Sequence, residues 1–227
     1  MTATDRVVTL FDVDNTLLDN DAVHRDLSEH LERQFGAASR DRYWAIFETL
    51  RNELGYADYL GALQRYRHEA PNDSRLLLMS GYLMDYPFAG RLFPGALGAI
   101  ERLRGLGPTV ILSDGDVVFQ PRKVQRSGLW EAVQGRVLIY IHKEEMLDQI
   151  SRLYPAQHYI MVDDKLRILS AMKKQWGSRL TTIFPRQGHY ALDPKITAAF
   201  PPADLTVDSI GELGQLDLNT IPGIAPQ

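Results

Sequence analysis

Short apolar runs alternate with amphipathic stretches along most of the chain. Residues 7–12, Val-Val-Thr-Leu-Phe-Asp, are rich in β-branched and aromatic residues, which predicts a strand buried on both faces. Similar runs, the last one weaker, occur at residues 109–112, 137–141, 158–162, 180–184 and 205–207. Between most of these runs, apolar residues three or four apart predict helices at residues 95–106, 117–127, 144–153 and 166–175. The alternation of strand and helix predicts right-handed βαβ units and therefore an α/β fold with a doubly wound parallel sheet.

The connection between the first and second predicted strands breaks this alternation. Helical patterns without a convincing strand fill it, at residues 21–35, 40–54, 58–68 and 74–85. So long a segment exceeds an ordinary loop, so we expect an inserted all-helical domain at residues 19–90. Residues 1–18 and 91–227 would then form the core domain. Residues 217–227 show little periodicity, which predicts a loosely held tail.

Composition narrows the functional classes. The chain has 227 residues, 44% of them hydrophobic, which suffices for one sizeable core and an insertion. The absence of cysteine excludes disulfides, thiolate catalysis and cysteine-ligated metals. A net charge of −4 without a Lys/Arg block argues against nucleic-acid binding and favours a small ligand. No targeting segment and no apolar run of about 20 residues is found, so we expect a cytoplasmic protein without a membrane partner. The oligomeric state stays open.

Two carboxylates follow the first predicted strand. Asp12 and Asp14 are two residues apart, and strand alternation points both side chains the same way. Open parallel sheets bind ligands beyond the carboxyl ends of their strands, which is where these acids lie. An Asp-rich stretch in this position can also be only a turn or a helix cap, so this motif alone leaves both interpretations open.

Two further strand ends carry residues suited to phosphate. Ser113, Asp114 and Gly115 follow the second strand, and the serine hydroxyl and successive backbone N–H groups could hold a phosphoryl oxygen. Lys143 follows the third strand, where it could neutralise phosphate and hold nearby carboxylates together. Alone, each of these segments is more often an ordinary turn or surface residue.

The fourth strand ends in a pair of acids, Asp163 and Asp164. In a pocket of low dielectric they would repel Asp12 and Asp14 unless a cation lay among them. Mg²⁺ is the natural counter-ion because it prefers oxygen ligands, accepts a few carboxylates and retains waters that a phosphate can replace.

With these residues in order at four strand ends, the chain resembles the haloacid dehalogenase (HAD) superfamily, whose four loop motifs occur in this sequence. The matching residues are Asp12 and Asp14, then Ser113, then Lys143, and finally Asp163 and Asp164. The resemblance covers the whole core, and the first motif is its most specific part. The Leu-Phe-Pro-Gly segment at residues 92–95 is also typical of the family, and the helical insertion is similar to a C1-type cap.

The resemblance implies the chemistry of the site. Asp12 would attack phosphorus to give an aspartyl phosphate, while Asp14 protonates the leaving group and then activates water. Mg²⁺ would be held by the Asp12 carboxylate, the backbone carbonyl of Asp14 and the Asp164 carboxylate. Asp163 would be a further acceptor or ligand. The phosphate-binding residues would be Ser113, Asp114 and Lys143.

The expected function is therefore that of a magnesium-dependent phosphatase acting on a small phosphorylated metabolite. Asp14 favours phosphoester hydrolysis, since the dehalogenase branch lacks this acid/base and needs no metal. A phosphomutase with the same site stays an alternative. So does a non-catalytic scaffold that binds phosphate or metal.

Two positions depart from the family pattern, and the substrate contacts are undefined. Asn15 stands where glycine is commoner, and Ile168 and Leu169 occupy the region where a further Asp or Asn is usual. Lys165 is expected on the surface, since it would oppose the charge of the metal if it pointed inward. Candidate substrate contacts, none of which stands out, are Tyr43, Trp44, Arg65, Arg67, His68, Arg75, Arg186, Gln187, Gly188, His189 and Tyr190. Trp44 is expected to pack the core of the insertion.

Overall fold

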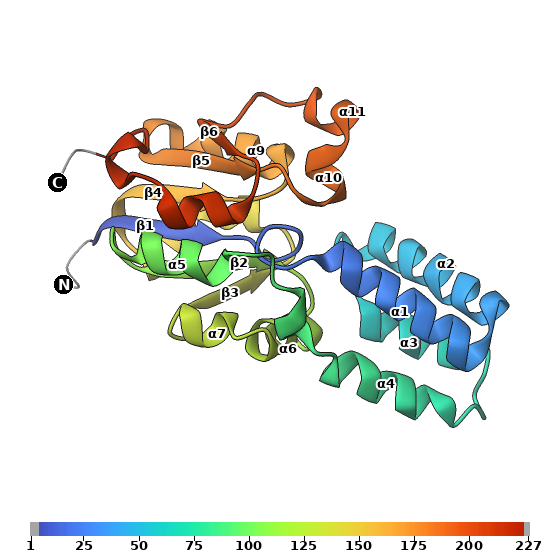
Figure 1. The fold of residues 1–227 in the computed structure, drawn as a ribbon. Coiled ribbons are helices and arrows are strands. Elements are labelled where there is room, and N and C mark those ends of the chain that lie inside the picture. Colours follow the sequence, from blue (N-terminus) through green and yellow to red (C-terminus); the bar gives the residue numbers. More distant parts are fainter. Residues whose placement is uncertain (1–4, 225–227) are drawn as a thin grey trace.

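The computed structural model describes residues 5–224, which contain one six-stranded sheet (Figure 1). Its strands are β1 (Asp5–Phe11), β2 (Thr109–Asp114), β3 (Val137–Tyr140), β4 (Ala156–Val162), β5 (Leu180–Pro185) and β6 (Leu205–Val207). All neighbouring strands are parallel, in the order β3-β2-β1-β4-β5-β6. The order reverses between β1 and β4, which is the topological switch point of a doubly wound sheet. The predicted fold class is confirmed.

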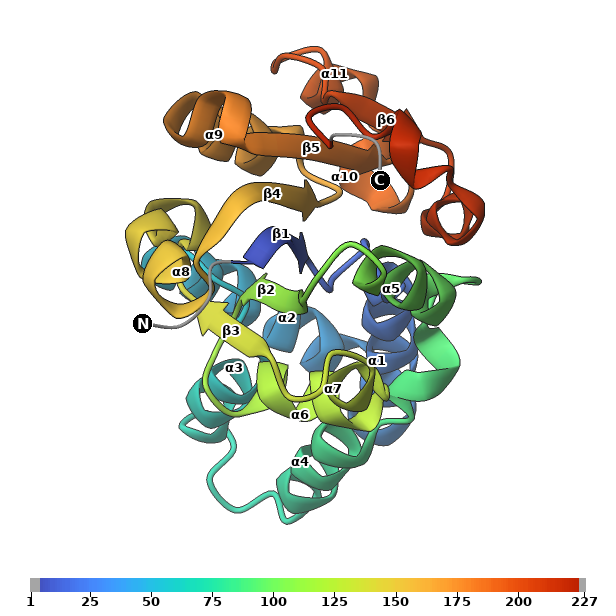
Figure 2. The same ribbon diagram turned by 90° about the vertical axis from the view of Figure 1, so that its left-hand side faces the viewer.

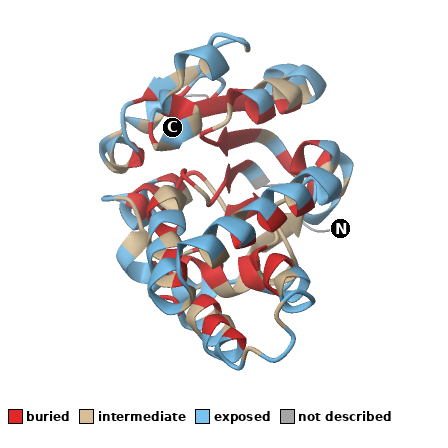
Figure 3. Ribbon diagram, turned by 90° about the vertical axis from the view of Figure 1, so that its right-hand side faces the viewer, coloured by how far each residue is buried: buried red, intermediate tan, exposed pale blue. Residues whose placement is uncertain are grey.

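Helices cover both faces of the sheet, so the central strands β1, β2, β4 and β5 are largely buried, whereas the edge strands β3 and β6 are more exposed (Figures 2 and 3). Along β1, Val7 and Phe11 belong to one apolar cluster, whereas Val8 and Leu10 belong to another on the opposite face. Helices α5 (Ala96–Arg104), α6 (Phe119–Arg126) and α7 (Leu129–Ala132) pack into the first cluster, which also includes residues of the four helices between β1 and β2. The helices packed into the second cluster are α8 (Leu147–Leu153), α9 (Leu166–Trp176) and α10 (Gly188–Leu192). This arrangement explains the continuous apolar runs of the strands.

A group of four helices stands between β1 and β2 in the sequence, beside the carboxyl ends of the strands (Figure 1). They are α1 (Asn20–Phe35), α2 (Ala37–Leu54), α3 (Tyr59–Arg67) and α4 (Arg75–Asp85), and we call them the helical insertion. The segments that enter and leave it lie side by side. Leu18 forms a β-bridge with Leu92, and the Phe93 N–H donates to the Leu17 carbonyl at 2.9 Å. The chain therefore enters and leaves the insertion at one place, next to the carboxyl ends of the strands.

Smaller elements complete the described chain. They are α11 (Pro194–Thr197) and the 3₁₀ turns Phe88–Arg91, Lys143–Glu145, Gly177–Arg179, Ile210–Gln215 and Leu218–Thr220. The helix predicted at residues 144–153 is thus divided into a 3₁₀ turn and α8. Within the described residues, no helix combines the length and apolar character needed to cross a bilayer.

The C-terminal segment differs from its prediction. We expected residues 217–227 to be loosely held, but Ile221 and Ile224 are buried in the main apolar cluster. The prediction is wrong for residues 217–224 because two isolated isoleucines anchor the segment without any periodic pattern. Residues 225–227 lie outside the described part of the chain.

Candidate active site

Asp12 lies directly beyond the end of β1, at the centre of the predicted site. Its backbone N–H donates to the Val162 carbonyl of β4 at 3.0 Å, which fixes it at the switch point of the sheet. The residue is only 3% exposed. One carboxylate oxygen of Asp12 lies 2.5 Å from Lys143 Nζ, and the other accepts a hydrogen bond from Thr16 Oγ1 at 3.2 Å. Both oxygens are therefore held in place.

Lys143 reaches this carboxylate from the 3₁₀ turn after β3. Its ammonium also lies 2.7 Å from Asp163 Oδ2, so one buried cation serves two carboxylates. Burial alone would lower the pKa of Lys143, but the facing charges of Asp12 and Asp163 raise it above its ordinary value. The lysine is therefore charged at neutral pH.

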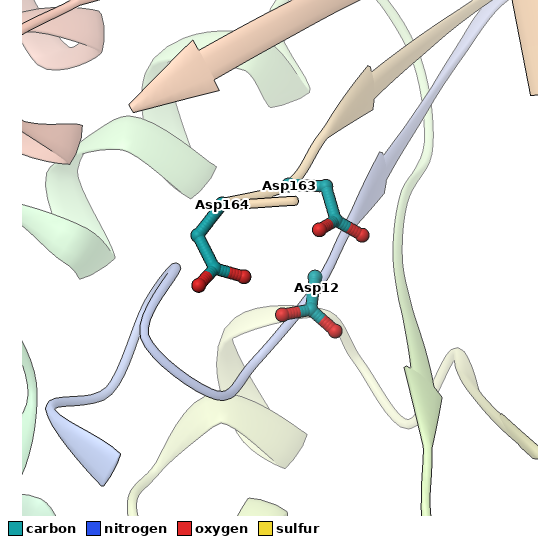
Figure 4. Close-up of side chains that lie close together, drawn as sticks. All are labelled: Asp12, Asp163 and Asp164. Carbon is teal, nitrogen blue, oxygen red and sulfur yellow. The ribbon is translucent and has the colours of Figure 1, made fainter. Parts of the chain in front are cut away.

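Asp163 and Asp164 turn their carboxylates toward Asp12 (Figure 4). Each of the three residues offers an oxygen within 4.8 Å of the other two, and all three are buried. Burial raises the pKa of Asp163 to about 6, although Lys143 opposes this shift. Burial also raises the pKa of Asp164, well above its ordinary range, and the neighbouring carboxylates add to this effect. Such a cluster of negative charge is unfavourable unless positive charge compensates it.

The three carboxylates fit a divalent cation. Neither oxygen of Asp164 has a hydrogen-bond partner among the described residues, and Lys143 pairs only with the other two acids. Buried unpaired carboxylate oxygens close to two others are the oxygen-only donor set that Mg²⁺ prefers. Of the four predicted metal ligands, the side chains of Asp12, Asp163 and Asp164 therefore converge. The carboxylate of Asp14 is outside this cluster.

Asp14 instead faces a different set of partners. Its Oδ1 lies 2.6 Å from Lys123 Nζ, and its Oδ2 accepts a hydrogen bond from Gln120 Nε2 at 3.4 Å. The Asp14 side chain is 24% exposed and lines a cavity, whereas the Asp12 side chain is 4% exposed. Asp14 is thus the more accessible of the two acids of the first motif.

Ser113 and Asp114 end β2 next to this pair. The buried Ser113 hydroxyl accepts from Gln120 Nε2 at 2.9 Å and donates to the Asp114 carbonyl at 3.3 Å. The Asp114 carboxylate accepts the backbone N–H of Lys143 at 2.8 Å, and burial raises its pKa. This carboxylate therefore ties the second motif to the third.

A cavity of about 510 Å³ lies between the helical insertion and the loop that follows β1, which carries Asp12 and Asp14 and which we call the motif-one loop. Asp14 and Asn15 line it from the sheet side, and Phe47, Arg51 and Tyr59 line it from the insertion. Asp12, Ser113 and Lys143 are not among its lining residues and lie buried beside it. The cavity therefore has room for the body of a small ligand beside the buried Asp12.

Most of the substrate-contact candidates from the sequence do not line this cavity. Those that do not are Tyr43, Trp44, Arg65, Arg67, His68, Arg75, Arg186, Gln187 and Gly188. Tyr43 is buried in the insertion, and Trp44 packs there against Phe47, as expected for Trp44. Only His189 and Tyr190 of the candidate set line the cavity.

Lys165 was expected on the surface, and this prediction is wrong. The residue is half-buried and lines the cavity, with Nζ 5.1 Å from the centre of the Tyr190 ring. Burial alone would lower the pKa of Lys165, but attraction from Asp164, Asp12 and Asp163 raises it. The carboxylates that could hold a metal thus also attract this ammonium, which favours its inward position.

The loop after β5 holds the motif-one loop from the other side. Gln187 Nε2 donates to the Thr16 carbonyl at 2.6 Å, and His189 Nδ1 lies 2.6 Å from Asp21 Oδ1. Asn15 has a φ of 62°, a left-handed conformation that asparagine tolerates better than most residues. Its Oδ1 accepts the backbone N–H of Asn20 at 3.0 Å. Asn15 can thus replace the commoner glycine and also cap the start of α1.

Three site residues were missed in the sequence: Thr16, Gln120 and Lys123. Thr16 bridges two motifs, because its hydroxyl donates to Asp12 and accepts the Asp164 N–H at 2.9 Å. Gln120 and Lys123 lie three apart on α6, beside the buried Phe119 and Val124. Polar residues on the apolar face of an amphipathic helix are the signal that could have revealed them.

A family profile of haloacid dehalogenase-like hydrolases matches residues 8–174. The chain therefore belongs to the haloacid dehalogenase-like hydrolases, which confirms the resemblance read from the four motifs. Among curated proteins, no sequence matches the chain significantly.

Solved structures of this family share the fold. A haloacid dehalogenase-like hydrolase from Burkholderia xenovorans LB400 is 69% identical, with a TM-score of 0.89 over 94% of this chain and 99% of that chain. Magnesium-bound HAD-hydrolase YfnB from Bacillus subtilis is 17% identical (TM-score 0.61; 94% and 98% covered). An L-2-haloacid dehalogenase from Xanthobacter autotrophicus, with chloropropionic acid covalently bound, is 16% identical (TM-score 0.60; 92% and 96% covered). The last two similarities concern the fold alone.

Proposed function

We propose that the protein is a magnesium-dependent phosphatase that hydrolyses a small phosphorylated metabolite through an aspartyl phosphate on Asp12. The observation that carries this proposal is the convergence of Asp12, Asp163 and Asp164, with both oxygens of Asp164 unpartnered among the described residues. Nucleophilic attack on carbon by a single carboxylate would not require two more buried acids beside it. Attack on a phosphoryl group, whose oxygens are anionic, requires compensating positive charge.

The side chains divide the reaction into two steps. In the first, an Asp12 oxygen bonds to phosphorus as the bond to the leaving oxygen breaks, and Asp14 gives that oxygen a proton. In the second, Asp14 takes a proton from water, whose oxygen bonds to phosphorus as the bond to Asp12 breaks. This releases phosphate, restores the Asp12 carboxylate and returns Asp14 to its protonated form. The accessibility of Asp14 at the cavity and the burial of Asp12 support this division of roles.

The remaining residues of the site would bind the metal and balance the negative charge of the carboxylates. Asp12, Asp163 and Asp164 would hold Mg²⁺, which when bound supplies positive charge toward the phosphoryl oxygens. Lys143 neutralises Asp12 and Asp163 at 2.5 and 2.7 Å, so the nucleophile is positioned before any substrate arrives. The helical insertion, which we propose to be a cap, supplies the opposite wall of the cavity.

The decisive test is hydrolysis of p-nitrophenyl phosphate and acetyl phosphate with Mg²⁺ and with a chelator. We expect activity only with the metal. Asp12→Asn should lower kcat to background, a loss of several orders of magnitude, because the nucleophile is removed. Asp14→Asn should lower kcat by about 10²- to 10⁴-fold and leave an acyl phosphate that can be trapped. The exposed Asp148 on α8, changed to Asn, is the matched control and should retain full activity.

Three outcomes would contradict the proposal. They are turnover in chelator, turnover by Asp12→Asn, and release of halide from 2-haloacids without any phosphatase activity. Hydrolysis in ¹⁸O-labelled water separates a phosphatase from a phosphomutase. A phosphatase transfers the phosphoryl group to water, so the label enters the released phosphate. A phosphomutase transfers it to a second substrate hydroxyl, so no labelled phosphate forms. A screen of phosphorylated metabolites would then identify the substrate.

A further inference from the structure

We propose that Lys123, with Gln120 beside it, is a positioning residue that fixes the carboxylate of Asp14 for acid/base chemistry. This inference rests on the proposed function, because it assigns the orientation of Asp14 to two residues outside the four motifs. Both residues lie on α6, three positions apart, on the side of the helix that is buried.

The Lys123 ammonium is surrounded by two hydrogen-bond acceptors and two aromatic rings. Lys123 Nζ donates to Asp14 Oδ1 at 2.6 Å and to Asn20 Oδ1 at 3.0 Å. The rings of Phe119 and Tyr59 lie with their centres 5.6 and 5.9 Å from the same nitrogen. The side chain is 0% exposed. An ammonium removed from water in this way needs hydrogen-bond acceptors, and Asp14 and Asn20 provide them.

The two α6 residues hold both oxygens of the Asp14 carboxylate. Lys123 takes Oδ1, and Gln120 Nε2 takes Oδ2 at 3.4 Å while it also donates to Ser113 Oγ at 2.9 Å. A carboxylate bound at both oxygens cannot rotate freely about its terminal torsion. Asp14 is thereby kept at the wall of the cavity, where it can meet a leaving group, instead of turning toward the cluster around Asp12.

Lys123 also connects Asp14 to the helical insertion. Asn20 is the first residue of α1, and its Nδ2 donates to Tyr59 Oη on α3 at 3.4 Å. One ammonium therefore contacts the acid of the sheet domain and the first residue of the insertion together. Because Lys123 does not line the cavity, we infer that it acts through Asp14 rather than by touching substrate.

The test is Lys123→Met, which keeps the length of the side chain and removes the ammonium. We expect kcat to fall by about 10- to 100-fold, because a displaced acid loses much of the benefit of general acid/base catalysis. KM should change by less than about three-fold, since no substrate contact is lost. The matched control is Lys174→Met on the exposed side of α9, which should leave both constants unchanged.

A double-mutant cycle separates positioning from a merely structural role. If Lys123 acts through Asp14, Lys123→Met should have no further effect on the phosphorylation rate in the Asp14→Asn background. Losses that multiply in the double variant, or a Lys123→Met enzyme with wild-type kcat, would overturn the inference. If Lys123→Met does not fold, the same cycle is run with Lys123→Gln and with Gln120→Met. Failure of the proposed function would look different, because wild-type enzyme itself would not cleave phosphate esters.

Discussion

Two side chains hold the carboxylate of Asp12 in position: the hydroxyl of Thr16 and the ammonium of Lys143. Thr16 is completely buried, and its Oγ1 both donates to Asp12 Oδ2 at 3.2 Å and accepts the Asp164 N–H at 2.9 Å. A single side chain thus couples the loop of the first motif to the loop of the fourth. Lys143 approaches the other oxygen of Asp12, so the two contacts together define the orientation of the carboxylate.

We therefore predict that Thr16→Val, which keeps the shape of the side chain, lowers both stability and activity. The buried Asp164 N–H would lose its acceptor, which should reduce the free energy of unfolding by about 1–3 kcal/mol. Asp12 would lose one of its two restraints, so kcat should fall by roughly ten-fold. Urea unfolding and steady-state kinetics measure the two effects.

A threonine on the surface provides the control. Thr49 is exposed on α2, where its hydroxyl donates only to the Ala45 carbonyl at 2.8 Å. Thr49→Val should change neither quantity appreciably. Equal effects of the two substitutions, or wild-type kcat in Thr16→Val, would show that the Thr16 hydroxyl does not orient the nucleophile.

At the scale of elements, the turn into α10 acts as a support for the motif-one loop. Gly188 has a φ of +76°, and a Cβ added there would lie 2.4 Å from the Asn15 Cβ. Glycine at position 188 therefore lets the turn approach the loop more closely than a residue with a side chain would permit. Its neighbour Tyr190 also accepts a hydrogen bond from Arg51 of α2, so the same turn contacts the helical insertion.

Gly188→Ala should accordingly disturb the site from a distance. The new methyl group would push Asn15 away, and with it the start of α1, so we expect lower thermal stability and a loss of kcat. Gly128→Ala is the matched control: its φ is +83°, but a Cβ there meets nothing within 4 Å. Both substitutions carry the cost of a left-handed residue, about 1 kcal/mol. Only Gly188→Ala should reduce activity, and equal activity in the two variants would exclude a supporting role for this turn.

Across the whole molecule, the sequence predicted the features that depend on local pattern. It missed the side-chain positions that depend on tertiary contacts. The apolar runs predicted the strands, and the acids at their ends predicted the cluster of Asp12, Asp163 and Asp164. Lys165 was misplaced because its inward position depends on the summed charge of Asp164, Asp12 and Asp163, which only the fold brings together. Lys123 was missed because its place on the apolar face of α6 indicates burial but does not identify Asp14 as its partner.

If the proposed metal site is correct, the same summed charge should make the stability of the whole protein depend on metal. In wild type, Mg²⁺ at 100 times its Kd should add about 2.7 kcal/mol to the free energy of unfolding. For a chain of this size this corresponds to a rise in Tm of roughly 5–10 °C.

Asp164→Asn removes a buried charge whose oxygens have no partner among the described residues. The metal-free variant should therefore melt no lower than metal-free wild type, yet its response to Mg²⁺ should largely disappear. Asp148→Asn, an exposed substitution of the same kind, should keep the full response. If Mg²⁺ stabilised Asp164→Asn as much as wild type, the three buried carboxylates would not be the metal site, and the charge they hold would need another partner.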